Sequence, residues 1–249
     1  MQPHRVSRRS RWVLADVKSL GEERDSTGMF ALLSASKLFA GMTDAIAAEC
    51  AGHFTLVRAR RGRQFFRQGD ACTLIYCLIR GFVHIERLTE DGDDFTVRVV
   101  DRGDFFGDES LFDKPVHSRS ATALDDCSVA VCRADTVKAL CMRYPLLGLN
   151  IARCLQEHHD RALNRIQVMA FNRAGDRLLT VLHDLAAKCG VREARGTRLE
   201  VVLTHTQLAT LIGTTRETVS YELGKLERNG HLFRRGRKLV IPSSPGAAA

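Results

Sequence analysis

The chain has 249 residues, of which 45% are hydrophobic and 27% charged, and its formal net charge is +8. This composition is typical of a globular protein with room for one large domain or two smaller ones. The basic balance favours polyanionic partners. No apolar run is long enough to span a bilayer, and charged residues follow the basic N-terminus too closely for a secretory signal. We therefore expect a cytoplasmic protein without a membrane partner.

The cysteines do not form a recognisable ligand cluster. There are eight, none in a CxxC pair, although the spacing Cys72-x4-Cys77 recurs as Cys127-x4-Cys132. Zinc and iron–sulfur sites need closer groupings, so no metal ligand is predicted. Scattered cysteines in a chain of this size are expected to be buried apolar residues in a reducing compartment.

The first predicted elements are a flexible basic arm at 1–35 and a sensor barrel at 36–144. The arm is expected to be a tail rather than a DNA contact. Glycine-centred turns at 69, 81, 92 and 103 are 12, 11 and 11 residues apart. Strand-like runs occur at 74–79, 82–88, 95–100 and 121–131. Short strands with turns at this spacing predict a β-sandwich or jelly-roll barrel.

A helix follows at 145–173, where the apolar period changes to that of a helix and no internal proline occurs. One stripe steps by four and three, the seam pattern of a coiled coil, which predicts a homodimer. A single helix packed on its own domain is the alternative. The stripe comprises Gly148, Ala152, Leu155, His159, Ala162, Ile166 and Met169.

The segment 174–242 predicts a winged helix-turn-helix, and a disordered tail is expected at 243–249. A helix at 176–188 and a strand at 199–203 come first. Thr204 and Gln207 form a capping box for a short helix, which Gly213 ends. Thr215 can cap a second helix that runs to about Arg228 and ends at Asn229-Gly230. A hairpin should follow at 232–241.

The second helix carries a polar face that suits DNA reading. Val219, Leu223 and Leu226 share one face at helical spacing, and the polar residues lie on another. Arginine can contact guanine through two acceptors and glutamate can accept from cytosine. A solvated charged face is the alternative. The candidate DNA-binding residues are Arg216, Glu217, Ser220, Tyr221, Thr204 and Thr206, with Arg235 and Lys238 of the hairpin as phosphate contacts.

The stretch from Ile212 to Glu227, IGTTRETVSYELGKLE, resembles the recognition-helix motif of the CRP/FNR superfamily. Barrel segments at 66–70, 75–81 and 103–112 resemble it too, and the resemblance covers roughly 38–241. It implies an α+β fold with an N-terminal β jelly-roll, a long dimerisation helix and a C-terminal winged helix-turn-helix. It also implies a symmetric homodimer that binds double-stranded DNA and acts on RNA polymerase, with Arg216 and Glu217 as base readers.

The same resemblance implies an effector site at Gly107, Asp108, Glu109, Arg119 and Ser120, with cyclic AMP or another cyclic nucleotide as ligand. The alternative for Arg119 is pairing with a protein carboxylate such as Glu109. The adenine contact on the long helix would fall at His158 and His159, or at Ala162 and Leu163. The cofactor stays unassigned, since a haem, redox or absent effector are alternatives. A nucleotide-binding module without DNA binding is the competing function, and no catalytic motif is found.

Overall fold

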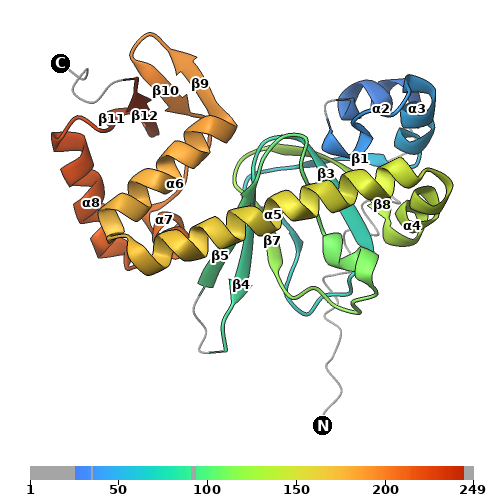
Figure 1. Ribbon diagram of the computed structural model, residues 1–249, viewed down its shortest axis with the longest axis horizontal. Coiled ribbons are helices and arrows are strands. Elements are labelled where there is room, and N and C mark those ends of the chain that lie inside the picture. The colour runs from blue at the N-terminus through green and yellow to red at the C-terminus, as the bar shows by residue number, and fades with distance from the viewer. Residues whose placement is uncertain (1–25, 35, 91–93, 244–249) are drawn as a thin grey trace. The chain divides into compact units, whose positions relative to one another are not determined.

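The computed structural model describes residues 26–34, 36–90 and 94–243 (Figure 1). Contacts divide the chain into two units. One comprises the residues up to Leu88 together with Val99–His158, and the other comprises Thr89–Arg98 together with the residues from His159 onward. Most of the arm predicted at 1–35 and all but the first residue of the predicted tail lie outside the described residues.

The strands from β1 to β8 form two four-stranded sheets, which confirms the expected β barrel, and all of them belong to the first unit except residues 94–98 of β5. One sheet has the order β1 (Thr55–Ala59), β8 (Cys127–Arg133), β3 (Leu74–Arg80) and β6 (Phe105–Phe106). The other has the order β2 (Gln64–Phe66), β7 (Ser120–Ala123), β4 (Val83–Leu88) and β5 (Asp94–Val100). Aromatic side chains from both sheets meet inside, since the Phe65 and Phe106 ring centroids are 5.2 Å apart.

Strand β3 is buried on both faces, which explains its unbroken apolar run. Its Cys77 and Ile79 belong to a core that also includes side chains of α2 (Ser26–Leu33), η1 (Lys37–Phe39) and α3 (Asp44–Ala51). Figure 1 shows α2, α3 and α4 (Ala134–Arg143) beside the N-terminal half of α5 (Pro145–Phe171). Because Met29 and Leu33 are 7% and 1% exposed, the predicted flexible arm does not extend through α2.

The run expected as one strand at 121–131 is two strands in different sheets. Two carboxylates stabilise the break between β7 and β8. Asp125 accepts a hydrogen bond from the Phe82 backbone N–H at 2.7 Å, and Asp126 accepts one from Arg61 N–H at 2.9 Å. Aspartate side chains that satisfy backbone donors favour turns over strands.

Helix α5 has the predicted position, and part of the predicted seam is exposed on it, namely Ala152, His159, Ala162 and Ile166. Two other members of the seam are covered, because Leu155 packs against the core of the first unit and Met169 lies against Gly213. The large apolar side chains that remain exposed are Leu149, Leu163 and Ile166, together with Phe171 at the end of the helix.

The second unit is a winged helix-turn-helix formed by α6 (Ala174–Cys189), α7 (His205–Ile212), α8 (Arg216–Arg228) and a four-stranded sheet. The sheet has the order β11 (Phe233–Arg235), β12 (Lys238–Pro242), β10 (Gly196–Leu199) and β9 (Gly190–Glu193). The strand expected at 199–203 thus lies three residues earlier. Gly196, with φ 147°, explains the position, because a Cβ there would lie 2.2 Å from the Ile241 carbonyl oxygen.

Within this second unit, Arg165 of α5 holds the start of β5 on α7. Its guanidinium donates to the carbonyl oxygens of Thr96 (2.6 Å), Val97 (3.0 Å) and Thr210 (3.2 Å) and lies over the Phe95 ring. Burial lowers the pKa of Arg165 to about 10. We call this set of contacts the Arg165 clamp.

Candidate functional site

The two helices of the helix-turn-helix begin and end where the sequence indicates. Thr204 Oγ1 accepts from the Gln207 backbone N–H at 3.1 Å, and the Gln207 side chain accepts from Thr204 N–H at 2.9 Å, which confirms the capping box. Gly213 ends α7 at φ 63°, a left-handed conformation that favours glycine. Thr215 caps α8 by accepting from Thr218 N–H at 3.2 Å.

Helix α8 separates a buried face from a polar one. Val219 and Leu223 are at most 1% exposed and fix the helix on the core of the domain. Arg216, Glu217 and Tyr221 are exposed, and the Tyr221 ring is 65% accessible. A capped helix that carries free polar side chains on its first two turns has the geometry of a recognition helix.

Ser220 is engaged within the protein, and its partner His205 was not among the predicted residues. Ser220 Oγ donates to the Arg216 carbonyl oxygen at 2.9 Å and lies 2.7 Å from His205 Nδ1. Burial lowers the pKa of His205, and the charges of Arg234 and Arg216 lower it further. No sequence motif indicates His205, which is the first residue of α7.

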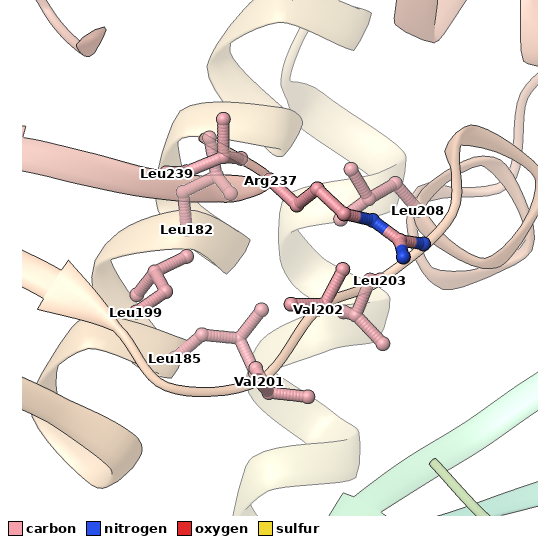
Figure 2. Close-up of a pocket in the computed structure, with 9 residues that line it drawn as sticks. All are labelled: Leu182, Leu185, Leu199, Val201, Val202, Leu203, Leu208, Arg237 and Leu239. Atoms are coloured by element: carbon pink, nitrogen blue, oxygen red, sulfur yellow. The ribbon is translucent and has the colours of Figure 1, made fainter. Parts of the chain in front are cut away.

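The basic residues of the wing differ in how far they are neutralised. Arg235 pairs with Glu193 at 3.0 Å and Lys238 with Glu200 at 3.1 Å. Arg237 has no carboxylate within ion-pair distance among the described residues. Figure 2 shows its side chain lying across a small pocket that is otherwise lined by eight aliphatic side chains. Arg237 is thus the wing arginine with an unpaired charge.

The candidate effector site begins at a glycine turn in the barrel. Gly107 has φ 80°, and a Cβ there would lie 2.7 Å from the Leu74 carbonyl oxygen, so this position requires glycine. The turn opens the short helix η2 (Asp108–Phe112). Ser110 Oγ donates to the Gly107 carbonyl oxygen at 2.7 Å, which stabilises the turn and places Asp108 and Glu109.

Arg119 faces the two carboxylates of this turn. Its Nη2 lies 3.4 Å from Asp108 Oδ2 and 3.5 Å from Glu109 Oε1. The structure therefore brings together Gly107, Asp108, Glu109 and Arg119, and it agrees with the alternative that Arg119 pairs with protein carboxylates. The Ser120 hydroxyl accepts from the backbone N–H of Gln68 at 3.0 Å, and its role in ligand binding stays a prediction.

Two unpredicted residues complete the surroundings of Glu109. The Ser118 backbone N–H donates to Glu109 Oε2 at 3.0 Å and the Ser118 hydroxyl donates to Oε1. His117 Nδ1 lies 3.6 Å from Oε2. Burial raises the pKa of Glu109, but the contacts with His117, Ser118 and Arg119 outweigh it and lower the pKa to about 2. His117 and Ser118 directly precede Arg119 in the sequence, and this position is the signal from which they could have been predicted.

One proposed adenine-contact position on α5 is occupied by an internal pair. His158 Nε2 lies 3.0 Å from Asp104 Oδ1, and Asp104 is buried. His159 is exposed. Of the two alignments considered for α5, the one that starts from Leu155 therefore places a base beside an imidazole that already has a carboxylate partner.

The cysteines are buried or half-buried and carry free thiols, in line with the expected packing role. Burial raises the pKa of Cys77 and of Cys132 to about 12, which disfavours the reactive thiolate. Among the described residues, no group of histidine, cysteine and acidic side chains could hold a metal ion. No described helix has both the length and the apolar composition needed to cross a membrane.

Comparison with known proteins agrees with this division into a sensor and a DNA-binding module. Residues 56–144 match the cyclic nucleotide-binding domain and residues 176–246 match the Crp-like helix-turn-helix domain. A cyclic AMP receptor protein of Thermus thermophilus is 31% identical over 68% of this chain and 76% of its own length. A CRP-like cAMP-activated global transcriptional regulator of Mycobacterium tuberculosis is 26% identical over 86% of this chain and 95% of its own.

The solved structures show the same fold. The c-di-GMP-responsive global regulator CLP of Xanthomonas campestris has a TM-score of 0.70 at 22% identity, over 81% of this chain and all of that one. The fold and the two matched modules define a DNA-binding transcription regulator with a cyclic nucleotide-binding domain. The chain belongs to the CRP/FNR family of transcription regulators.

Proposed function

We propose that the chain acts as a homodimer that binds a two-fold symmetric DNA site, with one α8 helix in each of two successive major grooves. The observation that carries this proposal is the capped α8, which presents Arg216, Glu217 and Tyr221 opposite its buried face. In this geometry Arg216 contacts guanine and Glu217 accepts from cytosine. Thr204 and Thr206 at the start of α7 contact phosphates.

The wing supplies sequence-independent affinity. Arg237 has the unpaired charge and is the first phosphate contact that we propose. Arg235 and Lys238 contribute less than their charge suggests, because each must leave a carboxylate that already neutralises it. Because Ser220 of α8 contacts His205 of α7, we assign it to orienting the neighbouring residues of these helices more than to reading bases.

Dimerisation is proposed through the exposed stripe of α5. Leu163 and Ile166 are 51% and 62% exposed on a helix whose other face is packed, and covering them removes apolar area from water. Ile166→Lys would place a charge in this contact and should give monomer at concentrations where the wild type is dimeric. Sedimentation of both proteins measures this, with the exposed-site change Gln167→Lys as a control. A variant that stays dimeric would exclude this stripe.

The barrel is proposed as the effector module, with the Gly107–Asp108–Glu109 turn and Arg119 in the responsive region. Ser120 also belongs to the predicted set, and its hydroxyl accepts from the backbone N–H of Gln68. Two of the relatives have names that refer to cyclic AMP, which is the ligand class to test first. The proposed regulator acts on RNA polymerase in the cytoplasm, and no step of this function requires a catalytic residue.

Selection of bound sequences from a random DNA pool tests the proposal. A dimer with two recognition helices should select two inverted half-sites whose centres are about 10–10.5 base pairs apart. Selection at two salt concentrations separates base reading from phosphate contacts. A single asymmetric motif, or no enrichment at any salt concentration, would contradict the proposed mode of binding.

A further inference from the structure

The segment 117–119 of the barrel forms a cradle for an anion. A backbone N–H and a hydroxyl of Ser118, the guanidinium of Arg119 and the imidazole of His117 face one point. Donors of these kinds, converging from one segment, are the usual recognition set for a carboxylate or phosphate oxygen. We call these three residues the anion cradle.

The anion cradle is held rigidly by the neighbouring loop. The His117 backbone N–H donates to the Asp70 carbonyl oxygen at 2.9 Å, and its carbonyl oxygen accepts from Gly69 N–H at 2.8 Å. The His117 ring stacks on Phe66 with centroids 3.6 Å apart and planes 9° apart. His117 is 2% exposed. The donors therefore do not depend on a ligand for their position.

The carboxylate of Glu109 already occupies the anion cradle. Both of its oxygens are used, Oε1 by the Ser118 hydroxyl and Arg119, and Oε2 by the Ser118 N–H. His117 Nδ1 lies 3.6 Å from Oε2 and 3.3 Å from Cys72 Sγ. The Glu109 side chain is 7% exposed, so the contact is closed to water rather than a loose surface pair. Asp108 adds a second negative charge 3.4 Å from Arg119.

The charges show what this occupation means for a second anion. Arg119 contributes one positive charge, and Asp108 and Glu109 contribute two negative charges at contact distance. A cyclic phosphate entering here would meet a net negative site whose donors are already used. Such a ligand could bind only after the Glu109 carboxylate leaves, and the lost contacts would subtract from its affinity.

We propose that Glu109 is a built-in anionic occupant of the barrel's anion cradle and determines its specificity by excluding cyclic phosphates. This inference rests on the proposed role of the barrel as the effector module. In the resting state of the module, the Glu109 carboxylate occupies the anion cradle. A nucleotide-binding site is therefore created by removing this carboxylate and not by adding a hydrogen-bond donor.

The test is calorimetric titration of the full-length protein with cyclic AMP and, separately, with inorganic phosphate. The variants are Glu109→Gln, which keeps the shape and removes the charge, and Glu109→Ala, which also vacates the space. Glu90→Gln makes the same chemical change at an exposed residue and serves as the matched control. Circular dichroism melting of each variant checks folding, and Glu109→Gln decides alone if Glu109→Ala is unfolded.

We expect the wild type and Glu90→Gln to bind cyclic AMP no tighter than about 1 mM, and a Glu109 variant to bind at least about tenfold tighter. Adding Arg119→Leu to that variant should remove the gain. Wild-type binding as tight as that of the Glu109 variants, or no gain in any folded Glu109 variant, would overturn the inference. The calorimetric outcome does not depend on whether the same preparations bind DNA, and DNA binding tests the proposed function separately.

Discussion

Replacing Arg216 by alanine should remove base discrimination without disturbing the helix that carries it. Arg216 is exposed at the first position of α8, and no described residue offers its guanidinium a carboxylate within ion-pair distance. The N-cap bond between Thr215 and Thr218 does not involve its side chain. The change therefore deletes a free cation and leaves the fold and the cap intact.

The expected loss of base discrimination follows from the absence of an ion-pair partner for Arg216 among the described residues. A two-point arginine–guanine contact is worth about 1–3 kcal/mol of discrimination, and a two-fold site contains the contact twice, which gives about 2–6 kcal/mol in all. Because Arg216 breaks no internal ion pair when it binds DNA, we expect Arg216→Ala to lose most of this discrimination energy. The loss should fall on one base-pair position in each half-site, since only one side chain is shortened.

The assay is selection from a random pool, followed by fluorescence anisotropy with the selected duplex at fixed salt. The control is Arg228→Ala, which removes the same charge from the other end of α8, where the side chain is exposed. Arg228→Ala should lower affinity for all sequences slightly and leave the motif unchanged. If Arg216→Ala selects the wild-type motif with equal information at every position, α8 does not read bases as described.

Three further predictions test other parts of the structure. Thr215→Ala removes the cap that accepts from Thr218 N–H and should destabilise the C-terminal unit by about 1 kcal/mol in denaturant unfolding, whereas an unchanged midpoint would show the cap to be idle. Arg237→Ala should reduce the slope of log affinity against log salt by about 0.9 per contact, and Arg235→Ala should reduce it less, because Arg235 is paired with Glu193. Equal slopes for the two variants would contradict this difference in ion pairing. Because the pKa of Glu109 is lowered to about 2, its charge stabilises the native state above about pH 4.5, and this contribution of about 3 kcal/mol is lost as the pH falls toward 2. Glu109→Gln should therefore flatten the acid unfolding curve over that range, and a curve parallel to that of the wild type would exclude the reasoning.

The DNA-binding helices could be predicted well because their signals are local. A capping box, a glycine at a left-handed position and a second cap each act within a few residues, and all three occur in the structure as predicted. The period of the apolar residues fixed the buried face of α8 in the same way. Exposure of Arg216 and Glu217 followed from that face.

The misplaced elements depend on contacts between segments far apart in the sequence. The break between β7 and β8 is stabilised by carboxylates that bind backbone donors near residues 61 and 82. Two members of the predicted seam of α5 are covered, because Leu155 packs on a core to which the first helices contribute and Met169 lies against Gly213. No periodicity within α5 reports which side another segment will cover. The domain boundaries proposed from the sequence stay predictions.

The effector site shows the same limit at the level of single residues. The motif located the turn at Gly107 and the arginine opposite it, and the structure brings them together. The motif indicated Ser120 and not Ser118, because the contact between Ser118 and Glu109 joins segments that the motif does not relate, and the role of Ser120 in ligand binding stays a prediction. Ser118 faces Glu109, whereas Ser120 binds the backbone of Gln68.

The Arg165 clamp implies that ionic strength acts on two parts of this molecule differently. Its guanidinium is half-buried and binds neutral carbonyl oxygens of Thr96, Val97 and Thr210, so added salt has no charge pair to screen there. The phosphate contacts proposed for the wing arginines should weaken steeply as salt rises. Concentrated salt should therefore release DNA from the C-terminal unit. The strand segment at 94–98 should stay bound to α7, so that the unit keeps the arrangement it needs to bind DNA again.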